Sequence, residues 1–211
     1  MKGILLKDSI LIRKYCIFHF IVSLIFFIIS ITGSSAETSN LNFTYYAVAM
    51  VSIIPITISA YDEQSKWNLY EAVLPVSRKQ IVLEKYLLTA LIVIPVSVIY
   101  SVILFAAKGG NLNEVLLNFT IMLLFGLISP CVILPIIYKF GYLKGRIINL
   151  IIIALLMAIA SVSAIASINA NQAVYSVFNS SFAVMILAAA AAVIFIISAA
   201  ISIYIYNKKE F

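Results

Sequence analysis

Charged residues divide this chain into long apolar stretches. Four stretches without any formal charge are each about as long as one helix: 15–36, 38–61, 86–107 and 115–138. About 20 apolar residues cross the hydrocarbon core of a bilayer as a helix. A fifth stretch, 147–207, is too long for one helix, and polar residues between Asn169 and Ser181 interrupt it. We therefore expect two helices in the fifth stretch.

The pattern predicts an all-α integral membrane protein with six transmembrane helices. Residues 150–159 are apolar on every side, whereas a half-buried strand would alternate apolar and polar positions. No remaining stretch is long enough for a soluble domain, so residues 1–211 are expected to form a single transmembrane domain. The predicted spans are 15–33, 43–60, 86–107, 115–138, 147–168 and 182–206.

Composition supports a membrane location. The chain is 64% hydrophobic and 10% charged, whereas soluble domains contain about 25% charged residues. This excess of apolar surface cannot be hidden inside a protein of 23.3 kDa and requires lipid as a solvent. Cys16 and Cys131 lie in or beside spans, which indicates small apolar residues rather than a disulfide framework.

The basic residues predict the orientation. If the N-terminus is inside, thirteen of the fourteen Lys and Arg residues fall in inner segments, and only Lys108 falls outside. Cytoplasmic loops retain such an excess. We therefore expect both termini in the cytoplasm and residues 2–14 at the inner interface. The net charge of +6 reflects topology and contact with membrane lipid, and it requires no nucleic-acid partner.

The inner segment 61–85 is the most informative part of the chain. It contains eight of the twenty-two charges and the only tryptophan. Trp67, Tyr70 and Leu74 are spaced i, i+3, i+7, which places them on one stripe of a helix, with Glu63 one turn earlier. This spacing predicts a short helix along the inner membrane surface. Such a helix either docks a partner or only rests on lipid, since Trp and Tyr favour the interface in both cases.

A second helix is predicted immediately after Pro75. Ser77 and Gln80 have the spacing of a capping box, and Val76 and Ile81 have that of a hydrophobic staple. These signals predict a sharp turn at 74–76 and a helix that runs from Arg78 into the third span.

The sequence contains no recognisable set of catalytic residues. A zinc site requires several closely spaced His, Cys or carboxylate ligands, but this chain has one histidine and two distant cysteines. His19 is interpreted as a helix-packing residue. No nucleophile elbow and no phosphate-binding loop occurs. We therefore expect that the chain is not an enzyme, contains no metal site and cannot hydrolyse ATP alone.

Ion-coupled transport is poorly supported, because the predicted spans contain no charged residue of the kind that marks ion pathways. The spans do contain Pro55, Pro95, Pro130 and Pro135, which suit helices that shift, although membrane helices also simply tolerate proline. Transport by this chain would need an external source of energy. The segment 61–85 is the obvious place for that source to dock.

One motif resembles a known family. The residues that carry it are Leu74-Pro75-Val76-Ser77-Arg78-Lys79-Gln80-Ile81-Val82 and Lys85-Tyr86-Leu87, with Asp62-Glu63 and Trp67 before them. Together with six spans and a charged loop after the second, they resemble the permease subunits of type-2 ATP-binding-cassette (ABC) exporters, in particular the small six-span bacterial permeases. The resemblance covers the whole chain in topology and about 25 residues in sequence.

The resemblance implies that a short coupling helix between spans 2 and 3 sits in a groove of a separate cytoplasmic ABC ATPase subunit. That subunit would bind ATP and Mg, and this chain would hold no cofactor. The residues before the first span would form an interface helix. The implied ATPase contacts are Glu63, Lys66, Trp67, Tyr70, Glu71 and Leu74, with Arg78 and Lys79 at the rim.

The resemblance also implies a second permease copy or paralogue, with the translocation path between the two. It suggests export of amphipathic or antimicrobial peptides from a bacterial cell, with the chain as a multi-pass protein of the cell membrane. The large extracellular domain of some members is missing here. Two other classes stay open: a membrane enzyme, and an ATP-independent secondary carrier or accessory polytopic membrane protein. Co-purification of a soluble ATPase would distinguish an ABC permease subunit from both of these classes.

Overall fold

The computed structural model describes residues 2–32, 37–67, 70, 76–108, 112–169 and 181–208, and this part of the chain contains helices and no strands. The all-α prediction is therefore confirmed for the described residues. In chain order the helices are α1 (Lys2–Tyr15), α2 (Ile17–Thr32), α3 (Glu37–Ser52), α4 (Ile54–Gln64), α6 (Arg78–Lys108), α7 (Leu112–Phe140), α8 (Tyr142–Asn169) and α10 (Ser181–Asn207).

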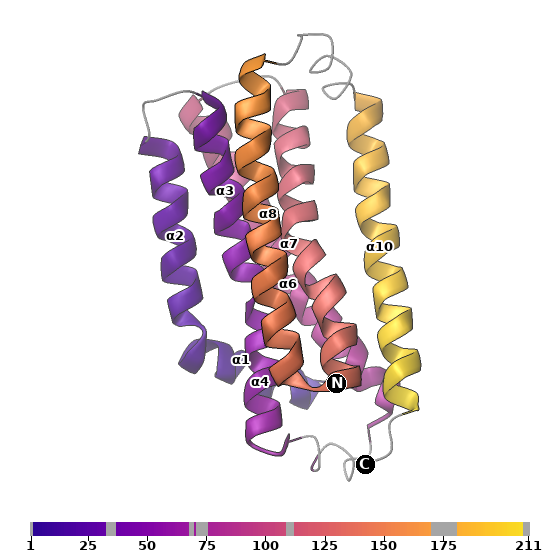
Figure 1. Ribbon diagram of the computed structural model, residues 1–211. Helices are drawn as coiled ribbons and strands as arrows, with labels where there is room; N and C mark the ends of the chain where they lie inside the picture. Colours follow the sequence, from indigo (N-terminus) through magenta and orange to yellow (C-terminus); the bar gives the residue numbers. More distant parts are fainter. Residues whose placement is uncertain are drawn as a thin grey trace.

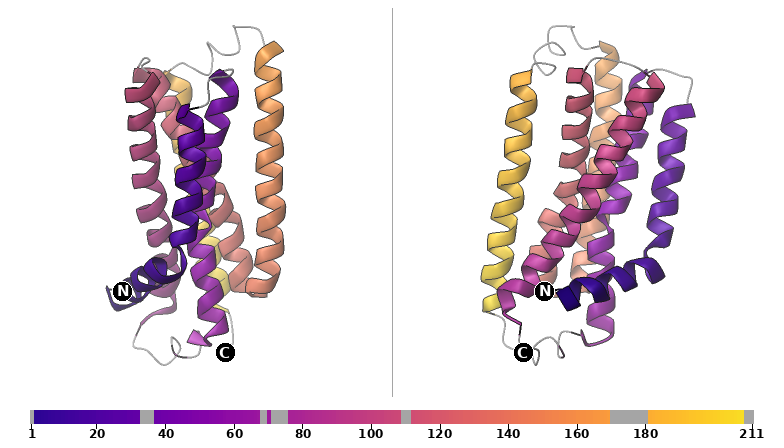
Figure 2. Two further views of the ribbon diagram at one scale, coloured as in Figure 1. Left: turned by 90° about the vertical axis from the view of Figure 1, so that its left-hand side faces the viewer. Right: turned by 180° about the vertical axis from the view of Figure 1, so that it is seen from behind.

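The long helices run side by side and α1 lies across one end of the bundle (Figure 1). The views in Figure 2 show α1 turned away from the direction of α2, beside the end of α4 and the start of α6. We call this end of the bundle the α1 end. Because α7 ends and α8 begins there, and α10 also ends there, nearly all described basic residues gather at the α1 end.

Several of these helices could cross a membrane. Four helices are long and apolar enough within the described residues, and the bent pair α1–α2 would make a fifth if counted as one span. The four are Phe43–Gln64, Arg78–Ala107, Val115–Phe140 and Met185–Asn207. The predicted span 147–168 lies inside the 28-residue helix α8. Two spans extend further at the α1 end than predicted, to Gln64 and from Arg78.

The chain bends sharply between α1 and α2. The two helices meet at Cys16 with a bend of 63°. The backbone N–H of Cys16 still donates to the carbonyl of Ile12 at 2.9 Å, so α1 keeps its last turn up to the bend. Next to the bend, the rings of Tyr15 and Tyr61 stack with centroids 4.2 Å apart. This contact ties the end of α1 to α4.

The prolines are accommodated without ending the spans. Pro55 lies in the first turn of α4, where its missing N–H needs no partner. The helical path continues across this point, because the N–H of Thr57 donates to the carbonyl of Ile53 at 2.9 Å. Pro95 lies inside α6, and Pro130 and Pro135 lie inside α7.

Apolar packing and short polar contacts hold the spans together. Phe27 of α2 and Tyr100 of α6 stack with ring centroids 3.9 Å apart, and Ser23 hydrogen-bonds to the Tyr100 hydroxyl at 2.8 Å. On the other side of the bundle, the Tyr86 hydroxyl meets Ser198 and Ser202 of α10 at 2.7 Å each. Such interhelical hydrogen bonds are favourable where water is absent.

Gly126 of α7 lies where α7, α3 and α6 approach one another closely. A Cβ atom at this position would lie 2.6 Å from a methyl group of Val93 on α6 and 2.8 Å from one of Val48 on α3. Small residues at such contacts let membrane helices pack closely. Gly126 therefore determines how tightly α7 fits between α3 and α6.

We expect Gly126→Ala to destabilise the bundle by about 1–3 kcal/mol, the usual cost of overpacking a filled interior. Gly3→Ala is the matched control, because nothing lies within 4 Å of a Cβ atom there. Thermal stability in detergent, measured as the monodisperse fraction after heating, compares the two. Equal stability of both variants would show that the helices do not pack closely at Gly126.

Candidate functional site

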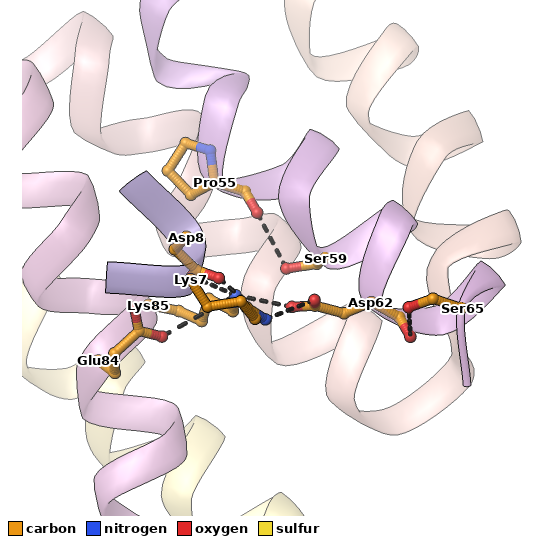
Figure 3. Close-up of polar contacts among 8 residues, drawn as sticks. All are labelled: Lys7, Asp8, Pro55, Ser59, Asp62, Ser65, Glu84 and Lys85. Atoms are coloured by element: carbon orange, nitrogen blue, oxygen red, sulfur yellow. Dashed lines mark hydrogen bonds and ion pairs between the residues drawn. The ribbon is translucent and has the colours of Figure 1, made fainter. Parts of the chain in front are cut away.

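A cluster of buried charges joins three helices at the α1 end. It consists of Lys7 and Asp8 on α1, Asp62 on α4, and Glu84 and Lys85 on α6 (Figure 3). The Lys85 ammonium lies 2.5 Å from an oxygen of Asp8 and 2.8 Å from one of Asp62. The Lys7 ammonium lies 2.6 Å from the other oxygen of Asp62 and 2.9 Å from Asp8. We call these five residues the ionic cluster.

The cluster depends on where α4 ends and α6 begins. Asp62 lies in the last turn of α4, where the helix dipole disfavours a negative charge. The two lysines offset this effect by pairing with both oxygens of its carboxylate. Lys85 is the eighth residue of α6 and lies immediately before the predicted start of the third span. It therefore points its ammonium group into the junction with α1 and α4.

Burial makes the pairing in the cluster indispensable. The side chains of Asp8 and Glu84 are 0% exposed, those of Lys85 and Asp62 are 5% and 7% exposed, and that of Lys7 is 19% exposed. A buried charge without a partner costs several kcal/mol. Three carboxyl groups face two ammonium groups, and Glu84 is the least well paired because its contact with Lys85 is 3.9 Å long. Lys85 is therefore the central cation.

A second contact links α4 to the connection between α7 and α8. A carboxylate oxygen of Glu63 accepts a hydrogen bond from the backbone N–H of Tyr142 at 2.6 Å. Tyr142 is the first residue of α8, so Glu63 satisfies an N–H that has no partner within the helix. Gly141 before it has a φ of +85°, a conformation that glycine adopts readily. The tight turn places α8 directly against the end of α4.

The segment after α4 differs from the expected continuous helix. Helix α4 ends at Gln64, and Lys66 has a φ of +56°, in the left-handed region. The expectation that Glu63 and Trp67 share one helix is therefore wrong, because the backbone reverses its twist between them. Beyond this point the rings of Trp67 and Tyr70 stack with centroids 6.2 Å apart, and the Lys7 ammonium lies 4.7 Å from the centre of the Trp67 ring.

The start of α6 agrees with the sequence prediction. The N–H of Gln80 donates to the Ser77 hydroxyl at 3.3 Å, and the N–H of Ser77 donates to the Gln80 side chain at 3.2 Å. The capping box is thus confirmed. Val76 packs against the apolar cluster that contains Ile81, as the hydrophobic staple requires. Arg78 donates to the backbone carbonyl of Asn207 at 2.9 Å, which joins the start of α6 to the end of α10.

The predicted ATPase contacts have different surroundings. Tyr70 is 68% exposed, whereas Trp67 is half-buried against Lys7. Glu63 is engaged with α8, and Arg78 with α10. Lys66 and Lys79 are exposed, but Glu71 and Leu74 lie outside the described residues.

Sequence reasoning missed the ionic cluster. The sequence pattern assigns Asp62, Glu84 and Lys85 to the inner segment 61–85 without partners, yet α4 and α6 extend far enough to bury all three. The signal in the sequence was two pairs of adjacent opposite charges, Lys7-Asp8 and Glu84-Lys85, each surrounded by apolar residues. Such pairs in an apolar context indicate charges that neutralise one another inside a protein.

Comparison with known proteins identifies the family. A model of the ABC-2 family of transporter proteins matches residues 3–207, nearly the whole chain. The chain belongs to the ABC-2 transporter family. No curated protein and no solved structure matches it significantly. Membrane components of the ABC-2 family typically work with ATPase subunits and are not themselves catalytic. The resemblance noted in the sequence is therefore confirmed at the level of the family.

For this ABC-2 protein we expect Lys85→Met to lower the free energy of unfolding by about 3–5 kcal/mol, because it leaves Asp8 and Asp62 buried with one cation fewer. Adding Asp8→Asn and Asp62→Asn to Lys85→Met is expected to recover much of the loss. Thermal melting of the detergent-solubilised protein measures both effects.

Glu84→Gln is the matched control at the neighbouring buried position. It replaces the side chain that pairs least well in the cluster with one of the same shape, so its melting temperature is expected to equal or exceed that of the unmodified protein. If Lys85→Met and Glu84→Gln were equally harmless, the cluster would not stabilise the junction of α1, α4 and α6.

Proposed function

We propose that this ABC-2 protein is a six-span permease subunit of an ABC exporter, driven by a separate ATPase that docks at the α1 end. The observation that carries this proposal is the ionic cluster beside the predicted docking segment. Asp62 and Lys85 lie near the two ends of that segment, residues 61–85, and their side chains meet at 2.8 Å. Both ends of the segment are therefore fixed to one another.

This arrangement would transmit force from the segment to the spans. A push on the segment between α4 and α6 reaches α1 through Asp8 and Lys7 in the same cluster. It reaches α8 through the hydrogen bond from Tyr142 to Glu63. An ATPase bound at one place would thus move several helices together, which is what coupling requires.

The orientation follows from charge. The α1 end holds the described Lys and Arg residues except Lys108, which ends α6 at the opposite end. Short cytoplasmic segments retain basic residues, so we assign the α1 end to the cytoplasm, where ATP is available. Helix α1, bent by 63° from α2, would lie along the inner membrane surface as an interface helix.

Two further parts of the proposal rest on the family resemblance. Two permease subunits, identical or paralogous, would enclose the translocation path between them. Amphipathic or antimicrobial peptides are the proposed cargo, since small six-span permeases of this kind resemble peptide exporters.

A second candidate function is an ATP-independent carrier. The buried charges of the ionic cluster favour it, because Glu84 and Lys85 lie within the candidate span Arg78–Ala107. Buried ionisable residues in spans often mark ion pathways. The dense pairing of the cluster at one end of the bundle fits a structural junction better than a path across the membrane.

The direct test is to purify the tagged protein from its own membranes and identify co-purifying subunits by mass spectrometry. The proposal predicts an ABC ATPase in stoichiometric amount. Peptide transport by vesicles that contain the chain alone, without an ATPase or ATP, would instead establish the carrier.

Tyr70→Ala tests the docking segment. Tyr70 is 68% exposed, so its truncation should not disturb the fold, and an aromatic anchor at an interface typically contributes a factor of roughly ten or more to affinity. We expect the amount of co-purified ATPase to fall accordingly. Trp67→Ala is a less specific test of docking, because it also removes the contact of the Trp67 ring with the Lys7 ammonium group.

Phe18→Ala is the control for Tyr70→Ala, since Phe18 is 71% exposed on α2, outside the docking segment. It should leave ATPase binding unchanged. Full ATPase binding by Tyr70→Ala would refute the assignment of Tyr70 while leaving the permease proposal intact. Absence of any ATPase from the unmodified complex would refute the permease proposal itself.

A further inference from the structure

A basic cavity that opens widely to the surface lies between the last turns of α7 and α10. Its volume is about 320 Å³, equivalent to about ten water molecules at about 30 Å³ each. It is lined by Tyr138, Lys139, Tyr204, Ile205 and Lys208. The cavity lies at the α1 end, because α7 and α10 both end there (Figure 1). None of its lining residues belongs to the ionic cluster or to the docking segment.

The chemistry of the cavity suits an anion. The Lys208 ammonium donates to the Tyr204 hydroxyl at 2.6 Å and lies 4.5 Å from the centre of that ring. Because the Tyr204 oxygen accepts this bond, its own hydroxyl hydrogen remains available to a ligand. Lys139 also lines the cavity, and its ammonium group lies 5.0 Å from the centre of the neighbouring Phe140 ring. Two cations and one hydroxyl donor are the groups that bind phosphate oxygens.

The acidic side chains that the structure describes near this end are occupied elsewhere. Asp8, Asp62 and Glu84 belong to the ionic cluster, and Glu63 accepts from Tyr142. In the described part of the chain, no acidic side chain forms an ion pair with Lys139 or Lys208. The ends of α7 and α10 present carbonyl groups, which do not attract anions. The two lysines must therefore provide the attraction.

An apolar strip on α10 leads from the cavity along the bundle. Ile197, Ile201, Tyr204 and Lys208 are spaced i, i+4, i+7 and i+11, so they share one helix face. Ile197 is 52% exposed and Ile201 is 47% exposed. The strip lies in the candidate span Met185–Asn207. A ligand that follows it would have an anionic end and a hydrocarbon end.

We propose that this cavity binds the headgroup of an anionic phospholipid, with its acyl chain along Ile197 and Ile201. Lys139, Lys208 and the Tyr204 hydroxyl bind the phosphate. The apolar strip distinguishes a lipid from soluble phosphate or an acidic peptide, because only an amphiphile satisfies both parts. Basic pockets between membrane helices are known to bind anionic headgroups. The proposal does not depend on the proposed coupling to an ATPase.

The test compares phosphatidylglycerol and phosphatidylcholine with the same acyl chains. Binding of each lipid to the full-length protein in detergent is measured by native mass spectrometry. We expect phosphatidylglycerol to bind the unmodified protein more tightly. The double variant Lys139→Gln with Lys208→Gln should lose this preference, by roughly 5-fold for each lysine and about 30-fold together. Lys139→Arg with Lys208→Arg should retain it.

The matched control is Lys14→Gln with Lys79→Gln, which removes the same charge from exposed positions outside the cavity. It should keep the preference for phosphatidylglycerol. Equal loss in both double variants would overturn the proposal, since net charge rather than a site would then attract the lipid. Binding of inorganic phosphate or of an acidic peptide as tightly as the lipid would also overturn it. Both lysines are exposed, so the variants are expected to fold.

Discussion

The buried ammonium group of Lys85 holds the α1 end of this protein together. It pairs with Asp8 on α1 and with Asp62 on α4 within 2.8 Å, and the side chains of all three residues are at most 7% exposed. In such surroundings each carboxylate needs its cation, because water is not there to replace it. These two ion pairs hold α1 crosswise against the end of α4 and the start of α6.

The ionic cluster is the structural feature of this chain that we connect with the way ABC-2 proteins work. Membrane components of the ABC-2 family typically work with separate ATPase subunits, and we propose that motion reaches this chain from such a subunit. The charge-rich connection between α4 and α6 lies between Asp62 and Lys85, which contact one another. Force applied there acts on a joined unit of three helices. The bonds of Tyr86 to Ser198 and Ser202 extend this unit to α10.

The sequence predicted local features well and the buried contacts poorly. Charge-free stretches defined the helices, and Ser77 with Gln80 located the start of α6, because both signals depend on neighbours in the chain. The pairing of Lys7 with Asp62 joins residues 55 positions apart, and no local pattern encodes it. The left-handed backbone conformation of Lys66 could not be predicted either, because lysine seldom adopts that conformation.

The most direct test is the distance between α1 and α6. Spin labels on cysteines introduced at the exposed positions Leu6 and Leu91 avoid the native Cys16 and Cys131, which are buried. Pulsed electron paramagnetic resonance then measures the distribution of distances between the two spin labels. If the ionic cluster fixes α1, the distribution is narrow in the unmodified protein and broad when Lys85 is replaced by methionine. An equally narrow distribution in both would contradict the account.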